Sequence, residues 1–231
     1  MNSKRKQAKK GESLRWGSTS WHSLPGEGPK TTLIVTFLGA DVKTYLHNYP
    51  AALADRDLQC PICGGRCHCH GWYRRWVYDG SERAQVSILR VICLNCGRTH
   101  AVVPDFIRPY GRHSQQVREK AVIAVLTTST SPEKAGQASF VDAETVRRWV
   151  KEFKARVEQS AGGLVSILAR HYPERAGPIH PSRKETLEHA FYRMAGWCRQ
   201  LAQALPALPR SSSLFGLVNI LLAWGGLRIW V

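Results

Sequence analysis

The chain has 231 residues, and its 33 lysines and arginines outnumber its 17 aspartates and glutamates, which gives a formal net charge of +16. That length suffices for one or two domains with a hydrophobic core, and the basic excess favours a polyanionic partner, nucleic acid before an anionic membrane, over a merely soluble basic protein. Seven cysteines and no secretory signal at the N-terminus argue against a disulfide framework, so we expect a cytoplasmic, nucleoid-associated protein with reduced thiols.

The first part of the chain divides into a tail and a lead-in. Residues 1–29 are basic at first and then rich in Gly, Ser and Pro, which predicts a disordered tail able to contact phosphate. In the lead-in, residues 30–58, the β-branched run 31–39 predicts a strand. A short helix or turn is expected at 42–50, and we expect Pro50 to end it.

Two cysteine pairs of identical C-x-x-C spacing, each followed at once by glycine, stand on either side of a predicted hairpin. Two thiolates at this spacing can converge on one ion where the backbone turns tightly, and glycine permits that turn. Four sulfurs form a closed tetrahedral shell, so we predict a structural zinc ion in a zinc ribbon spanning 59–110, rather than a redox-active pair. The predicted ligands are Cys60, Cys63, Cys93 and Cys96.

The hairpin between the pairs is predicted from two β-rich segments, 72–78 and 84–93, joined by the turn signal Asp79-Gly80. Four further candidate ligands precede it, and we interpret them as bystanders on the connection into the first strand. A second, weak metal site, or a histidine replacing one cysteine ligand, stays open for them. These residues are Cys67, His68, Cys69 and His70.

Residues 111–160 have the order of a helix-turn-helix: a helix, a short helix, a tight turn and a third helix. Ser131 and Asp142 are the expected N-caps of the second and third helices. The alternative is a plain three-helix packing unit with a solvated charged face. The predicted helices span 113–128, 131–139 and 143–159.

The third of these helices has the composition of a recognition helix, with an apolar side toward the other two and a basic side toward solvent. Residues near the start of such a helix reach base edges, and cations further along contact phosphates of double-stranded DNA. The predicted base contacts are Thr145, Arg147 and Arg148. The predicted phosphate contacts are Lys151, Lys154 and Arg156.

The chain beyond this unit is predicted to be a linker followed by helices. The linker, 161–184, is expected to begin where Gly162 and Gly163 stop the preceding helix. The C-terminal helices, 185–231, comprise an amphipathic helix and a final apolar run that is marginal for a membrane span and is interrupted by glycines and polar residues. We interpret that run as a helix that packs on the core or on a partner, either a transposase or a second copy of the chain, and not as a membrane anchor.

The order of these motifs resembles two related families. C-P-I-C-G, H-G-W-Y-R-R, D-G, I-L-R-V-I-C-L-N-C-G-R-T-H, P-D-F-I-R-P-Y and T-V-R-R-W-V-K-E-F follow one another over roughly residues 31–160. This series resembles the bacterial proteins labelled DUF6431 and the N-terminal part of ISL3-like insertion-sequence transposases. The resemblance implies zinc on the four paired cysteines and DNA binding by the helices that follow them.

A transposase of that kind continues into a ribonuclease-H-like domain, in which Asp and Glu residues hold two magnesium ions. Here no aspartate follows Asp142, and the carboxylates Glu174, Glu185 and Glu188 follow no strand pattern. We therefore expect an α+β protein, a zinc-ribbon hairpin followed by a helix-turn-helix bundle and C-terminal helices, that binds DNA without catalysis in transposition or regulation. A DNA-binding subunit of a transposase whose catalytic domain is on another chain, and a protein–protein interaction module, remain alternatives.

Overall fold

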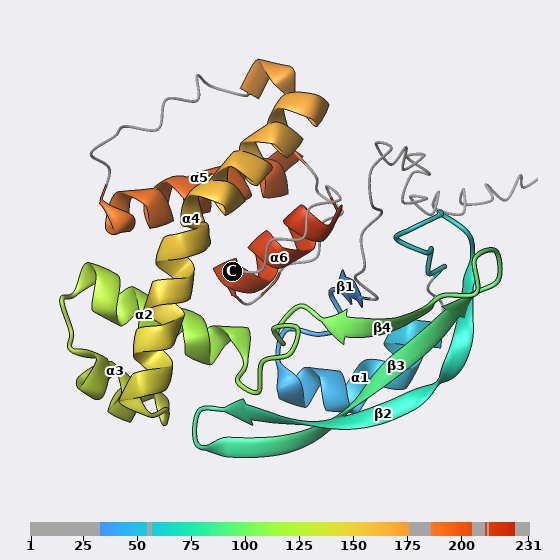
Figure 1. Cartoon of the computed structure of the whole chain (residues 1–231), viewed down its shortest axis with the longest axis horizontal. Helices are drawn as coiled ribbons and strands as arrows, with labels where there is room; N and C mark the ends of the chain where they lie inside the picture. The colour runs from blue at the N-terminus through green and yellow to red at the C-terminus, as the bar shows by residue number, and fades with distance from the viewer. Residues whose placement is uncertain (1–32, 55–56, 176–185, 205–210, 212, 225–231) are drawn as a thin grey trace, which may run out of the picture.

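The computed structural model describes residues 33–54, 57–175, 186–204, 211 and 213–224 (Figure 1). It confirms the α+β class, with a four-stranded sheet and six α-helices in this part of the chain. In chain order the elements are β1 (Leu33–Thr36), α1 (Val42–Ala54), β2 (Cys67–Asp79), β3 (Glu82–Cys93), β4 (Thr99–Pro104), α2 (Gln115–Thr127), α3 (Pro132–Ser139), α4 (Ala143–His171), the 3-10 turn Pro173–Arg175, α5 (Leu187–Ala204) and α6 (Leu214–Trp224).

The sheet is built around the predicted hairpin. Its strand order is β1-β4-β3-β2, with β1 parallel to β4 and the other pairs antiparallel. The β2–β3 pairing runs from Cys67 opposite Cys93 to Asp79 opposite Glu82, which confirms the turn at Asp79-Gly80. Because β2 begins at Cys67, the CHCH segment is part of the strand, and the prediction that it lies on a connection before the strand is wrong.

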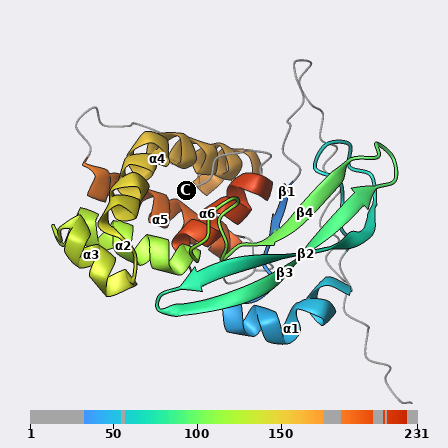
Figure 2. The same ribbon diagram turned by 60° about the horizontal axis from the view of Figure 1, so that its bottom comes forward.

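Helix α1 lies across one face of the sheet and shares its core (Figure 2). Val42 and Tyr45 are buried against the strands, and the Tyr45 hydroxyl donates a hydrogen bond to the carbonyl oxygen of Ser87 on β3. The helix continues through Pro50 to Ala54, so the prediction that Pro50 ends it is wrong. A proline removes one helical hydrogen bond, but the buried Leu53 beyond it packs into the sheet core, and that burial favours another helical turn.

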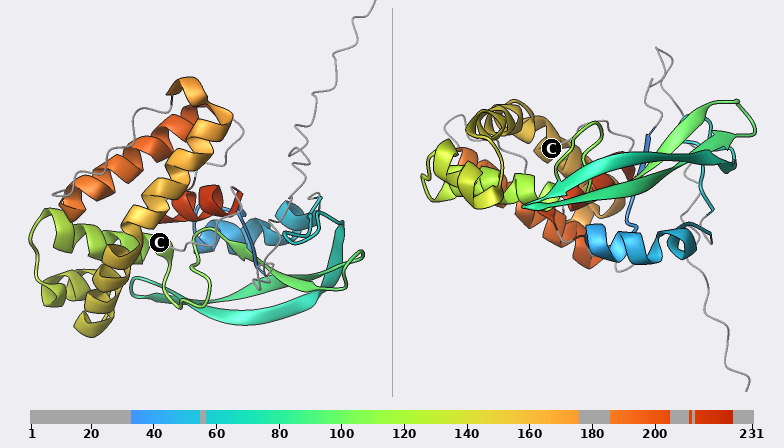
Figure 3. Two further views of the ribbon diagram at one scale, coloured as in Figure 1. Left: turned by 45° about the horizontal axis from the view of Figure 1, so that its top comes forward. Right: turned by 90° about the horizontal axis from the view of Figure 1, so that it is seen from below.

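Helices α2 to α6 form a second core beside the tip of the hairpin (Figure 3). Two predicted N-caps in this region are confirmed by hydrogen bonds from backbone amides: Ser131 accepts from Lys134, and Asp142 from Thr145. Helix α2 is capped in the same way by Ser114, which accepts from Val117 and was not predicted as a cap. These caps fix the order helix, short helix, turn, helix over residues 115–171.

The predicted linker at 161–184 is wrong over its first part, because α4 continues to His171. Two glycines inside a helix cost about 1 kcal/mol each relative to alanine. Leu164, Ile167 and Leu168 are nearly inaccessible in the second core, and burial of side chains of this size contributes roughly 2 kcal/mol each. Packing therefore outweighs the glycine penalty. The rest of the predicted linker, like the predicted tail at 1–29, lies outside the described residues.

The apolar segment near the C-terminus folds back on the protein. The Phe215 ring of α6 stacks on Phe153 of α4, with centroids 5.6 Å apart. At the start of α6, one carboxylate oxygen of Glu119 accepts hydrogen bonds from the hydroxyl of Ser213 (2.7 Å) and the amide of Phe215 (2.9 Å). Among the helices that the structure describes, none combines the length and apolarity that crossing a membrane requires.

Candidate metal centre and basic helix face

The two cysteine knuckles have the same backbone geometry. In the first, the amide of Cys60 donates to the carbonyl of Gly65 (2.8 Å) and that of Gly64 to Cys60 (2.9 Å). In the second, the amide of Cys93 donates to Arg98 (2.9 Å) and that of Gly97 to Cys93 (3.0 Å). Gly64 and Gly97 have φ angles of 70° and 68°, a region that glycine enters without the penalty a Cβ atom brings. The C-x-x-C-G sequence thus folds twice into the same tight turn.

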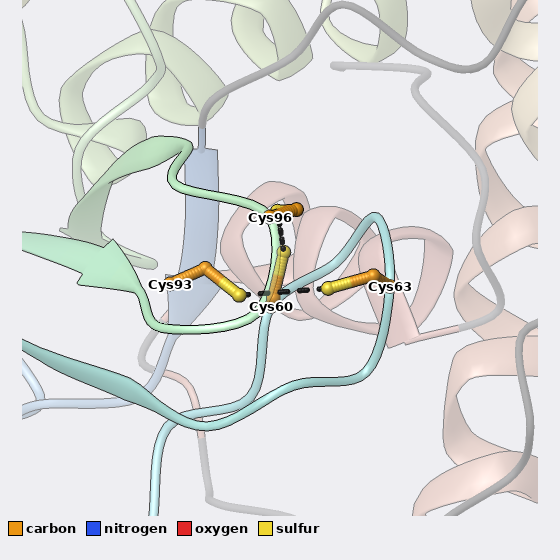
Figure 4. A group of neighbouring side chains, drawn as sticks. All are labelled: Cys60, Cys63, Cys93 and Cys96. Carbon is orange, nitrogen blue, oxygen red and sulfur yellow. Dashed lines mark hydrogen bonds between the residues drawn. The ribbon is translucent and has the colours of Figure 1, made fainter.

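The hairpin brings the knuckles together at its open end, opposite the turn at Asp79-Gly80, and Figure 4 shows the four side chains side by side. The sulfur atoms of Cys60, Cys63, Cys93 and Cys96 all lie within 4.8 Å of one another. Sγ of Cys60 is 3.7 Å from Sγ of Cys96, and Sγ of Cys63 is 3.5 Å from Sγ of Cys93. All four predicted ligands therefore converge, and together they could hold a single metal ion.

The environment of these thiols differs between the inner and outer residues. Cys60 and Cys93 are buried, whereas Cys63 and Cys96 are exposed. Burial raises the pKa of Cys60 to about 12, because a thiolate away from water lacks hydration. At Cys93 burial also raises the pKa of the thiol, but hydrogen bonds from the amides of Cys96 and Asn95 outweigh this effect and lower the pKa to about 7. A bound cation would supply the compensating charge that the buried sulfur of Cys60 needs.

A histidine that the sequence analysis did not select lies against this cluster. Nε2 of His100, on β4, is 3.2 Å from Sγ of Cys60, and the side chain is only 1% exposed. Burial lowers its pKa, which favours the neutral ring. Nδ1 is buried without a hydrogen-bond partner among the described residues, which fits a bare acceptor there and a proton on Nε2 directed at the sulfur. Its place four residues after Cys96 was the only sequence signal for it.

The CHCH segment lies beside the cluster. Cys67 is half-buried, and burial followed by the neighbouring Cys93 raises the pKa of its thiol to about 11. Within the described part of the chain, its sulfur is not among the four that converge. His68, Cys69 and His70 are exposed on β2, and the strand has an irregular register between Cys69 and Gly71.

Near the start of α4, two of the predicted DNA-contacting residues form contacts within the protein that the sequence analysis did not predict. Thr145 is 9% exposed, and both its amide and its hydroxyl donate to the carboxylate of Asp142 at 2.7 Å. The expectation that it faces solvent is therefore wrong, because its side chain completes the helix cap. Arg147 is half-exposed and forms ion pairs with Glu133 of α3 and Glu144 of α4.

Three other cations line the solvent side of α4. Arg148, Lys151 and Lys154 are exposed, while Trp149 and Phe153 between them are buried in the second core. Positions three and four apart lie on one side of a helix, so these cations form a continuous basic stripe. Arg156 is half-buried on the same helix.

The comparison with known proteins matches the part of the chain that contains the cysteine centre and ends at the start of the basic stripe. Residues 60–149 match the model of a family described as a domain of unknown function, DUF6431. No curated protein and no solved structure matches the chain. The matched segment begins at the first knuckle and ends within α4, so the expected similarity to the DUF6431 family is confirmed for the cysteine centre and for the helices from α2 to the start of α4.

Proposed function

We propose that this chain is a non-catalytic, zinc-dependent DNA-binding protein. In this proposal the four cysteines hold a structural zinc ion, and α2, α3 and α4 form a helix-turn-helix that places the start of α4 in the major groove of double-stranded DNA. The basic stripe on α4 carries the proposal, because three exposed cations follow one another on the solvent side of the third helix. The net charge of +16 supports the same partner.

The donor set supports zinc as the metal. Soft thiolate ligands in a closed shell of four suit zinc. With Zn–S distances of about 2.3 Å, a regular tetrahedron separates neighbouring sulfurs by about 3.8 Å. The separations of 3.7 and 3.5 Å fit that value. A shell of this kind leaves no position for a reacting water, so the ion would stabilise the fold.

We predict that His100→Phe weakens zinc binding by roughly 10- to 100-fold, since the ring would no longer hydrogen-bond to the Cys60 sulfur. Competition with a chromogenic chelator measures the affinity. The matched control is His68→Phe, an exposed histidine one residue beyond Cys67, which should leave the affinity unchanged. Equal affinities for the two variants would contradict the role assigned to His100.

The biological setting proposed for this activity is transposition or regulation. The motif order resembles the N-terminal part of ISL3-like transposases, and the absence of aspartate from the sequence after Asp142 supports a role without catalysis. A DNA-binding subunit that acts with a separate catalytic chain fits the same features. A magnesium-dependent nicking assay distinguishes them: cleavage by the purified protein, lost on carboxylate replacement, would contradict the non-catalytic proposal.

We predict different effects from the two ends of the basic stripe. Arg148→Ala should relax sequence preference, whereas Lys154→Ala should weaken binding to all duplexes alike and reduce the salt slope by about 1. Fluorescence anisotropy with selected and random duplexes measures both. Arg170→Ala is the matched control, because Arg170 is exposed on α4 about 24 Å further along the helix axis than Lys154.

Equal losses from Arg148→Ala and Arg170→Ala would mean that the interface lies elsewhere. Duplex affinity that is undetectable, or that does not fall with added salt, would favour the interaction-module alternative over DNA binding.

A further inference from the structure

A cavity of about 680 Å³ lies on the sheet, apart from both the cysteine centre and the α4 stripe. Strands β2 and β3 and the loop after β4 provide its polar and aromatic lining: Tyr73, Arg75, Trp76, Tyr78, Arg83, Tyr110 and Arg112. Of the described residues that line it, none has a carboxylate. The cavity is therefore both aromatic and cationic, a combination that neither the metal centre nor the helical core requires.

The wall formed by the loop is held in place from inside. The guanidinium of Arg75 donates to the carbonyl oxygens of Arg108 (3.0 Å) and Gly111. Between these two anchors, Tyr110 has a φ angle of 62° and is 84% exposed. A residue with a side chain pays a penalty in this conformation, so the anchored loop presents the tyrosine ring to solvent at an energetic cost.

A second part of the lining, on β2 and β3, is a cation stacked on two aromatic rings. The guanidinium carbon of Arg83 lies 3.8 Å from the Trp76 ring centroid and 5.7 Å from that of Tyr78. Trp76 remains 43% exposed, and Arg83 is exposed as well. Exposed tryptophan and tyrosine rings beside arginine are the surface on which unpaired bases stack in proteins that bind single strands.

We propose that this cavity binds unpaired nucleotides of a single nucleic-acid strand. Its volume falls within the range of small-ligand sites, the rings offer faces for bases, and Arg83 and Arg112 offer charge for the phosphates. Arg75 is not assigned that role, because its Nη2 group donates to the two loop carbonyls and holds the loop in place. This inference goes beyond the proposed function and does not require α4 to dock on a duplex.

The position of the cavity connects it with the helices. The Tyr78 ring is 5.5 Å from the His113 ring, which is in turn 5.2 Å from the Trp149 ring on α4. The amide of Ser114 also donates to the carbonyl of Tyr78 at 2.9 Å. These contacts place the first turns of α4 near the β2 wall of the cavity. If both surfaces act together, a duplex with a single-stranded overhang should bind more tightly than a blunt duplex.

Fluorescence anisotropy with the full zinc-loaded chain tests the proposal, using labelled oligothymidine, blunt duplex, and unlabelled thymidine monophosphate as competitor. Trp76→Ala should weaken oligothymidine binding by roughly 5- to 150-fold and leave blunt-duplex binding within about twofold. The matched control is Trp72→Ala, because Trp72 is equally exposed on β2 but does not line the cavity. Arg112→Gln should weaken oligothymidine binding, and Arg98→Gln, exposed at the cysteine end, should not.

Each outcome separates this proposal from that for α4. If Arg148→Ala alters duplex binding while oligothymidine binding survives, the two surfaces act separately and both proposals are supported. If the parent protein binds oligothymidine, and loses it in Trp76→Ala, but binds no duplex, only the cavity is supported. Equal losses from Trp76→Ala and Trp72→Ala, or competition by thymidine monophosphate at the affinity of the strand, would overturn the proposal, the latter in favour of a free nucleotide. If circular dichroism shows that Trp76→Ala does not fold, the effect of Arg112→Gln on oligothymidine binding decides the proposal, because the Arg112 side chain is exposed on the loop and its replacement leaves the core unchanged.

Discussion

Cys93→Ser, or removal of zinc by a chelator, is expected to unfold residues 59–110 while α2 to α6 keep their helical circular dichroism. Zinc binding in modules of this kind contributes on the order of 10 kcal/mol to folding. That equals the whole stability of many domains, which lies at about 5–15 kcal/mol. The helices have a core of their own, in a cluster of buried residues separate from that of the sheet.

The same substitution removes more than a ligand. Cys93 is the last residue of β3, pairs with Cys67, and is followed by Leu94, whose amide donates to the carbonyl of Arg66 (3.1 Å). Loss of the metal would release both knuckles and with them the open end of the hairpin. The buried Cys60 would then carry either a thiol without a metal or a thiolate without compensating charge.

The measurement combines elemental analysis, which should find one zinc per chain, with far-UV circular dichroism before and after chelation. Cys69→Ser is the matched control, because Cys69 is an exposed cysteine on β2 whose sulfur lies outside the converging four. It should bind zinc and melt like the parent protein. A parent protein that contains no zinc and shows an unchanged spectrum after chelation would overturn the zinc proposal.

The parts of this molecule that could be predicted from sequence are those that local geometry determines. A C-x-x-C-G segment forms the same turn in both places, and the hairpin turn at Asp79-Gly80 depends on the residues of the turn itself. The helix starts at Ser131 and Asp142 are fixed by a side chain that caps an amide three residues on. Spacing was sufficient to identify the four converging cysteines.

The features that could not be predicted depend on contacts between distant segments. Strand β1 pairs with β4, and Leu33 is opposite Ala101, a partner that no local pattern specifies. Helix α4 continues through Gly162 because the residues beyond it are buried by α5 and α6. His100 reaches the metal centre because β4 pairs with β3 and brings it to Cys60. In each case tertiary packing outweighs the local preference.

Glu152→Gln is expected to destabilise the protein by about 3–5 kcal/mol, because it breaks an ion-pair network that joins the sheet to the helices. One oxygen of Glu152, on α4, lies 3.1 Å from Nη2 of Arg118 on α2 and 2.5 Å from Nη1 of Arg108 in the loop after β4. The Arg118 side chain is only 3% exposed, and its guanidinium carbon lies 5.6 Å from the Phe215 ring centroid. A neutral glutamine would leave a buried arginine without its counter-charge, and breaking a buried pair costs about this much.

A matched control is on the same helix. Glu158 of α4 pairs with Arg193 at 3.3 Å, but its side chain is 60% exposed, so Glu158→Gln should cost less than about 1 kcal/mol. Denaturant unfolding of both variants gives the comparison. Adding Arg118→Met to Glu152→Gln should recover part of the lost stability, because the double variant no longer buries an arginine charge without a partner.

If Glu152→Gln costs no more than Glu158→Gln, another group balances the charge of Arg118 and the network does not fix α4 against the sheet.

If the loss of stability is as large as expected, the same pair of variants also tests the nucleic-acid proposals. Arg108 belongs to the loop that Arg75 anchors beside the cavity, and Glu152 lies next to Lys151 on the basic stripe. The network would then hold the two proposed nucleic-acid surfaces in one orientation. A duplex with an overhang, which needs both surfaces, should lose more affinity from Glu152→Gln than oligothymidine, which needs only the cavity.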